Sequence, residues 1–239
     1  KPAPRKGKTL LNMKGKKSEI PSSWDEEFDI VVVGFGYAGG ISAIEAHDEG
    51  GKVLLIEKMP DPGGISICSG GSVRFARDTE NAFQYLKATN AGTTPDDVLR
   101  TFAEGMRDLP EYIGDLAKKT KAKLTIKKAP ANYPLPGYDA FEAITIREFP
   151  DFDATVDYPH VSGLMRADGT RLFKVIENNV AQRGIDTRLS TEADRLITNP
   201  GGEVCGLTIR SGSSEKFVKA RRGLILACGG FEADEEMKR

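Results

Sequence analysis

Residues 28–39, which read FDIVVVGFGYAG, decide the fold of this chain. The β-branched first half of the stretch is typical of a strand buried on both faces of a parallel sheet. The second half carries three glycines at the spacing GxGxxG and leads into small residues at helical spacing. Gly34 would make a tight turn, Gly36 would let the backbone approach a pyrophosphate, and Gly39 would let helix and strand pack closely. The stretch therefore predicts a dinucleotide site where the strand meets the helix.

A second buried strand is expected at residues 52–57, KVLLIE, after Gly50-Gly51 has ended the helix. The two strands and the helix form a βαβ unit, whose helix N-terminus would face the phosphates with unpaired N–H groups. Glu57 ends the second strand, 57 − 34 = 23 positions after Gly34. A carboxylate there accepts hydrogen bonds from a ribose 2′-hydroxyl and repels a 2′-phosphate, which disfavours NADP.

A second glycine cluster, GGISICSGG at residues 63–71, follows Glu57 by six positions. Its glycine pairs allow close backbone approach, and the hydroxyls of Ser66 and Ser69 can bond ligand oxygens. A ligand that reaches this cluster extends from the ribose acid back across the pyrophosphate, as an extended FAD does. The cluster therefore favours FAD over NAD, the alternative being a mobile loop without a ligand.

The remaining elements are expected from the same kinds of pattern. Residues 128–168 contain five prolines and no sustained period, so a lid, a binding wall or a disordered loop is expected there. Three late strands joined by turn sequences predict an antiparallel meander, followed by one more buried strand. The expected helices cover residues 79–90, 95–108, 110–123 and 168–184, and the expected strands cover residues 192–198, 203–210, 215–220 and 223–228.

Composition and charge narrow the class of protein. The 239 residues are 39% hydrophobic and 29% charged, which is enough to bury a core. The 34 basic and 35 acidic residues give a net charge of −1, which argues against nucleic-acid binding through bulk electrostatics. No apolar run approaches the roughly 20 residues that a membrane helix needs. Residues 1–17 hold seven basic side chains and no acidic one, so residues 1–22 are expected to form a basic flexible arm.

The chain has too few cysteines and histidines to predict a metal site or a Ser-His-Asp catalytic triad. The three cysteines form no C-x-x-C pair, and the two histidines, His47 and His160, stand far apart. No metal site is expected. Cysteines of this kind favour a cytoplasmic location, although a secreted or periplasmic protein after processing stays open.

Six segments together resemble one known group of proteins, and the resemblance covers roughly Trp24 to Met237. The group is the fumarate reductase/succinate dehydrogenase flavoprotein superfamily, and the nearest likeness within it is to FAD-dependent ketosteroid-dehydrogenase-like proteins. The segments are residues 29–39, residues 55–58 (LIEK), residues 63–71, Ala193-x-x-Leu196-Ile197, Gly202-x-Val204-x-Gly206-Leu207, and residues 220–231 (ARRGLILACGGF).

The resemblance implies an α/β fold at residues 23–239: a Rossmann-like parallel-sheet FAD-binding domain with a three-stranded antiparallel meander and a helical insertion at residues 79–168. It also implies which residues bind FAD. The pyrophosphate would be held by Gly34, Gly36, Tyr37, Ala38 and Gly39, and the adenosine side by Glu57 and Lys58. The phosphate and flavin region would be lined by Gly64, Ile65, Ser66, Ser69, Gly70 and Gly71. The Ala193 backbone would contact the adenine, and Ala227, Cys228 and Gly229 would close over the adenosine portion; the family commonly has Thr in place of Cys228.

The function implied is that of an FAD-dependent oxidoreductase acting on an activated C–C bond of a small molecule, such as a ketosteroid or a fumarate-like acid. Family members continue through a capping domain and a final glycine-rich FAD segment. The chain alone is therefore expected to bind FAD weakly and to be inactive. No catalytic acid or base is assigned, because packing is favoured over proton transfer for Tyr133, Tyr138 and Tyr158. An NAD-dependent dehydrogenase and a non-catalytic nucleotide-binding module are the alternatives.

Overall fold

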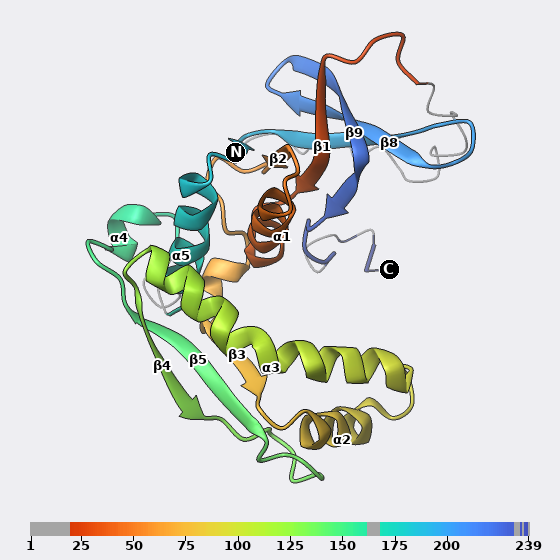
Figure 1. Cartoon of the computed structure of the whole chain (residues 1–239). Coiled ribbons are helices and arrows are strands. Elements are labelled where there is room, and N and C mark those ends of the chain that lie inside the picture. Colours follow the sequence, from red (N-terminus) through yellow and green to blue (C-terminus); the bar gives the residue numbers. More distant parts are fainter. Residues whose placement is uncertain (1–19, 162–167, 232–234, 236, 239) are drawn as a thin grey trace.

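The computed structural model describes residues 20–161, 168–231, 235, 237 and 238. Residues 1–19, which make up most of the expected basic arm, lie outside the described residues. The fold is mixed α/β, with a six-stranded sheet in the order β6-β2-β1-β9-β8-β7 and a three-stranded sheet in the order β3-β5-β4 (Figure 1). The strands of the first sheet are β1 Glu26–Val33, β2 Val53–Ile56, β6 Asp186–Arg188, β7 Glu192–Thr198, β8 Val204–Ser211 and β9 Ser214–Leu226.

The expected βαβ unit is present at the centre of the larger sheet. β1 pairs in parallel with β2, and α1 (Tyr37–Asp48) connects them. Val32 of β1 packs with residues of α1 and of α5 (Asp168–Gln182) in one core. Its neighbours Val31 and Val33 face the opposite side, where they pack against the meander. Burial on both faces explains why the strand lacks the polar alternation of a half-exposed strand.

The last strand of the meander and the buried strand expected after it form one element. β9 pairs antiparallel with β8 through its first half and parallel with β1 through its second half, so the expected break between residues 220 and 223 is wrong. The register with β1 shifts between Phe28 and Ile30. Ala220 and Gly223 of β9 lie opposite Phe28 and Ile30, so the extra residue of this β-bulge belongs to β9.

The smaller sheet was not expected from the sequence. It consists of β3 (Ser72–Ala76), β4 (Lys123–Lys128) and β5 (Phe141–Glu148), all antiparallel. The expectation of a loop throughout residues 128–168 is therefore wrong for β5. The prolines of this segment lie before and after β5 and do not interrupt it, and the strand forms because β3 and β4 pair with it from both sides.

The helical part of the insertion differs from expectation at one proline. α2 (Thr79–Asn90) is confirmed, whereas the two helices expected around Pro110 form a single helix, α3 (Asp96–Lys119). Proline removes one helical hydrogen bond. Buried side chains on both sides of it, such as Met106 and Ile113, offset that loss by packing against the core.

The arrangement leaves α1 and α5 side by side on one face of the large sheet, with α3 crossing below them toward α2 (Figure 1). The short helix α4 (Ala154–Asp157) precedes α5. Within the part of the chain that the structure describes, none of the helices has the length and apolar character that crossing a bilayer requires.

Candidate functional site

The first glycine of the fingerprint makes the turn at the carboxyl end of β1, between β2 and β9. Gly34 N donates to Ile56 O at 2.8 Å, and Ala227 N donates to Val33 O at 2.8 Å. Gly34 has φ = +102°, and a Cβ at this position would lie 2.4 Å from Ala227 O. Both the backbone angle and the space exclude any other residue.

The other two glycines let α1 begin directly against the turn. A Cβ on Gly39 would lie 1.7 Å from Gly34 O, and a Cβ on Gly36 would lie 2.9 Å from Ser66 Oγ. The absence of side chains at Gly36 and Gly39 therefore lets α1 pack closely against the Gly34 turn and Ser66. It also leaves the backbone of the turn without side chains that would cover it.

The N-terminus of α1 offers unpaired backbone donors. Tyr37 N donates to Ser66 Oγ at 3.0 Å. The amides of Ala38 and Gly39 have no hydrogen-bond partner among the described residues. Free N–H groups at the positive end of a helix dipole favour an anion such as a phosphate.

Glu57 points back toward the glycine turn. It is 9% exposed, and its Oε2 accepts from Phe35 N at 2.9 Å while its Oε1 accepts from Met59 N at 2.9 Å. A carboxylate has about four acceptor positions, so roughly two remain for ligand hydroxyls. The carboxylate is therefore fixed beside the turn by two backbone amides, and it can still accept further bonds.

Residues 188–191 run alongside the backbone of Glu57. Glu57 N donates to Arg188 O at 2.9 Å, and Thr191 N donates to Glu57 O at 2.8 Å. Ala193 follows two positions later at the start of β7, whereas the side chain of Lys58 is exposed.

The second glycine cluster packs against the first. Gly63 N donates to Phe35 O at 2.7 Å, and the short 3₁₀ helix η2 (Ser66–Cys68) lies in front of α1. Ile65 is 81% exposed on this loop. Thus the three regions expected to bind one ligand, around Gly34, Glu57 and Ser66, meet at the carboxyl ends of the parallel strands, which is where open α/β sheets bind ligands.

Three backbone groups that the sequence analysis did not name are central to this arrangement. Phe35 N and Met59 N fix the Glu57 carboxylate, and Phe35 O receives the bond from Gly63. Main-chain amides carry no residue signature, so only the three-dimensional structure reveals which of them take part.

Of the tyrosines considered as acids or bases, Tyr158 is buried in the core beside α5. Its hydroxyl donates to Glu177 Oε2 at 2.8 Å, and its ring packs on Phe173. Burial, followed by the charge of Glu177, raises the pKa of Tyr158 far above its usual value. Tyr133 and Tyr138 are exposed, at 64% and 43%. None of these observations assigns proton transfer to them.

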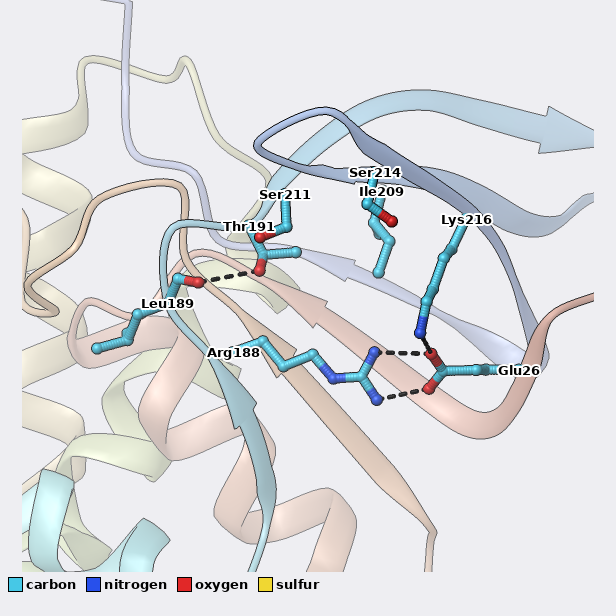
Figure 2. A pocket seen from close by; sticks show the side chains of 8 residues that line it. All are labelled: Glu26, Arg188, Leu189, Thr191, Ile209, Ser211, Ser214 and Lys216. Atoms are coloured by element: carbon cyan, nitrogen blue, oxygen red, sulfur yellow. Dashed lines mark hydrogen bonds and ion pairs between the residues drawn. The ribbon is translucent and has the colours of Figure 1, made fainter.

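A pocket of about 390 Å³ lies elsewhere, beside the amino-terminal part of β1 (Figure 2). Glu26 accepts hydrogen bonds there from both terminal nitrogens of Arg188, at 3.1 and 2.5 Å, and from Lys216 Nζ at 2.7 Å. The pocket contains no residue of either glycine cluster, and its charged groups bond one another. We assign it a structural role, which is to connect β1, β6 and β9.

This ion-pair network predicts an acid-sensitive contribution to stability. The hydrogen bonds from Arg188, followed by those from Lys216, lower the pKa of Glu26 to about 2. Because the pKa is lowered in the folded state, the contribution is fully present above pH 4.5 and is lost as the pH falls toward 2. We expect Glu26→Gln to lower the unfolding free energy by about 1–3 kcal/mol at pH 7 and by much less near pH 2.

Urea unfolding at several pH values measures this difference. Glu148→Gln is the control, because its pair with Lys123 is exposed at 66% and 72%, so a change of at most about 0.5 kcal/mol is expected. A Glu26→Gln effect that does not change with pH would contradict the role of ionised Glu26.

Comparison with known proteins identifies the nature of this site. Residues 29–239 match a family model described as an FAD binding domain. The chain is 27% identical to an NADH:fumarate oxidoreductase of Klebsiella pneumoniae, over 98% of this chain and 23% of that protein. It is 34% identical to a 3-oxo-5-alpha-steroid 4-dehydrogenase of Comamonas testosteroni, over 86% of this chain and 42% of that protein.

Solved structures share the fold. A 3-ketosteroid-delta4-(5alpha)-dehydrogenase of Rhodococcus jostii superposes with a TM-score of 0.73 at 21% identity, covering 90% of this chain and 48% of that one. A 3-ketosteroid delta1-dehydrogenase of Sterolibacterium denitrificans gives a TM-score of 0.74 at 22% identity, covering 89% and 49%. The chain thus spans less than half of the length of each of these proteins.

Proposed function

This chain belongs to the family of FAD binding domains, and on that premise we propose that it supplies the FAD-binding part of an oxidoreductase that acts on an activated C–C bond. The observation that carries the proposal is the convergence of both glycine clusters and Glu57 at the carboxyl ends of β1 and β2. The likeness to fumarate and 3-oxosteroid oxidoreductases supports a small substrate with a double or single C–C bond beside a carbonyl or carboxylate.

The residues present fit FAD. The positions where side chains would cover the turn are occupied by Gly34, Gly36 and Gly39, and the helix behind them presents the N–H groups of Ala38 and Gly39, which have no partner among the described residues. Glu57 is buried and retains free acceptor positions on its carboxylate, as a ribose requires. The site therefore offers backbone N–H donors for the phosphates of a dinucleotide and a carboxylate acceptor for the hydroxyls of its ribose.

The chain's own residues would bind and orient the cofactor. The amides of Ala38 and Gly39 would hold the pyrophosphate, and the Glu57 carboxylate would accept the ribose hydroxyls. Lys58, Ala193, Ala227, Cys228 and Gly229 would contact the adenosine side, while Gly64, Ile65, Ser66, Ser69, Gly70 and Gly71 would line the region toward the flavin. The flavin, when bound, supplies hydride transfer. The residues that would move the accompanying proton are not assigned within this chain.

The test is direct reconstitution of the 239-residue chain. We expect the protein, refolded with FAD and passed through gel filtration, to retain flavin absorbance in the protein peak, at a weaker affinity than a full-length relative. Competition by ADP should release the flavin, because the adenosine and pyrophosphate groups are shared. A colourless protein that binds NAD would overturn the proposal in favour of a nicotinamide enzyme.

The oxidoreductase part of the proposal needs a separate measurement. A longer polypeptide that contains this domain should reduce a dye acceptor with ketosteroids, or oxidise a reduced dye with fumarate-like acids. Tight FAD binding without turnover of any such compound would favour a non-catalytic nucleotide-binding module.

A further inference from the structure

Tyr37 is attached to the second glycine cluster at two points. Its backbone N–H donates to Ser66 Oγ at 3.0 Å, and its phenol oxygen lies 3.3 Å from Ser69 Oγ. These serines are 29 and 32 residues away along the chain. A single residue at the start of α1 therefore contacts both ends of the η2 turn.

The hydrogen bonds around the phenol have a fixed direction. Tyr37 Oη donates to Gly169 O at 2.8 Å, and a carbonyl can only accept, so the single phenol proton is used there. The Ser69 hydroxyl must then donate to Tyr37 Oη. Ser69 Oγ also accepts from Gly71 N at 3.2 Å. The result is one chain of bonds from Gly71 through Ser69 and Tyr37 to Gly169.

The two serines of the cluster consequently differ in what they can offer a ligand. Ser66 Oγ accepts from Tyr37 N, and within the described parts of the chain its own proton has no acceptor. The proton of Ser69 is already used in the bond to Tyr37. Ser66 is thus the serine whose hydroxyl can donate to a ligand oxygen, whereas Ser69 bonds within the protein.

The start of α5 packs against the same loop. A Cβ on Gly169 would lie 2.3 Å from Ser69 O, so the two backbones are in close contact. The ring of Tyr37 packs on Phe173 of α5, with 6.2 Å between ring centroids. Burial raises the pKa of Tyr37 above its ordinary value, which already lies well above neutral pH, so the phenol is protonated and able to donate.

We propose that Tyr37 is a positioning residue whose phenol holds residues 66–71 in the conformation that binds FAD. Its N–H is bonded to Ser66 Oγ, so the pyrophosphate contact that the resemblance implies for Tyr37 would be made by the amides of Ala38 and Gly39 instead. The inference rests on the proposed function, because FAD is the ligand that this loop is expected to contact. This role distinguishes Tyr37 from the other residues of the GxGxxG fingerprint, which would act through their backbone alone.

FAD and ADP titrations of four proteins test this role: wild type, Tyr37→Phe, Ser69→Ala and the double variant. We expect each single variant to weaken FAD binding about tenfold, and the double variant to be no weaker than either, because all three break one chain of bonds. ADP lacks the flavin half and should bind Tyr37→Phe within about twofold of wild type. Tyr133→Phe, an exposed tyrosine, should behave as wild type toward both ligands.

Several outcomes would overturn the inference. Unchanged FAD affinity in Tyr37→Phe, equal losses for FAD and ADP, or additive effects of the two substitutions would each do so. Amide hydrogen exchange of the ligand-free protein gives a readout that does not depend on binding: residues 63–71 should exchange faster in Tyr37→Phe, while β1 stays protected. Wild-type protein that fails to bind FAD would overturn the proposed function as well, whereas normal binding by both proteins would overturn only the role of Tyr37.

Discussion

Replacement of Gly39 by alanine is expected to abolish FAD binding and to destabilise the domain severely. The new Cβ would lie 1.7 Å from Gly34 O, which is a backbone atom of the turn. The turn cannot move away easily, because Gly34 N is bonded to Ile56 O. We expect at least about a hundredfold loss of FAD affinity and a loss of about 3–5 kcal/mol in unfolding free energy.

The matched control is Gly105→Ala in α3. No heavy atom of the described residues lies within 4 Å of a Cβ at this position, so the substitution should stabilise the helix by about 0.5–1 kcal/mol and leave FAD binding unchanged. Flavin titration and urea unfolding measure both quantities. Normal FAD affinity in Gly39→Ala would show that the first turn of α1 does not need to approach the strand this closely.

Glu57→Gln is expected to have the second largest effect. The two carboxylate oxygens each accept a backbone N–H, from Phe35 and from Met59. Whichever way the glutamine amide is turned, its NH₂ group faces one of these donors and leaves it unsatisfied. A buried unpaired donor costs about 1–3 kcal/mol, and the lost charge weakens the bonds to ribose. The unpaired donor should lower the unfolding free energy, whereas the weakened bonds to ribose should raise the Kd for FAD about a hundredfold.

Glu104→Gln, at an exposed position of α3, is the control for the same change of charge. It should alter the unfolding free energy by no more than about 0.5 kcal/mol and leave FAD binding as in wild type. If Glu57→Gln lowered stability but not FAD affinity, the carboxylate would be a structural group of the turn and not a ligand of the ribose.

The arrangement of the candidate site was largely predictable, because its main signals are contiguous in the chain. The strand at residues 28–33, the glycine spacing and the acid at Glu57 are local patterns, and the structure arranges them as the βαβ geometry requires. The smaller sheet was missed for the opposite reason. β3 and β5 are paired with Ser72 opposite Thr145, and neither segment has enough local periodicity to indicate a strand without its partner.

The sequence by itself determined the family, the parallel strands around α1 and the need for glycine at Gly34 and Gly39, because buried β-branched runs and glycine spacing constrain the backbone locally. Only the tertiary structure decided that Tyr37 would bond Ser69 and Gly169, which lie 32 and 132 residues away. It also decided that β9 would run unbroken from the meander into the parallel sheet. Such features depend on which distant groups come within hydrogen-bond reach after folding, and residue types along the chain do not record that proximity.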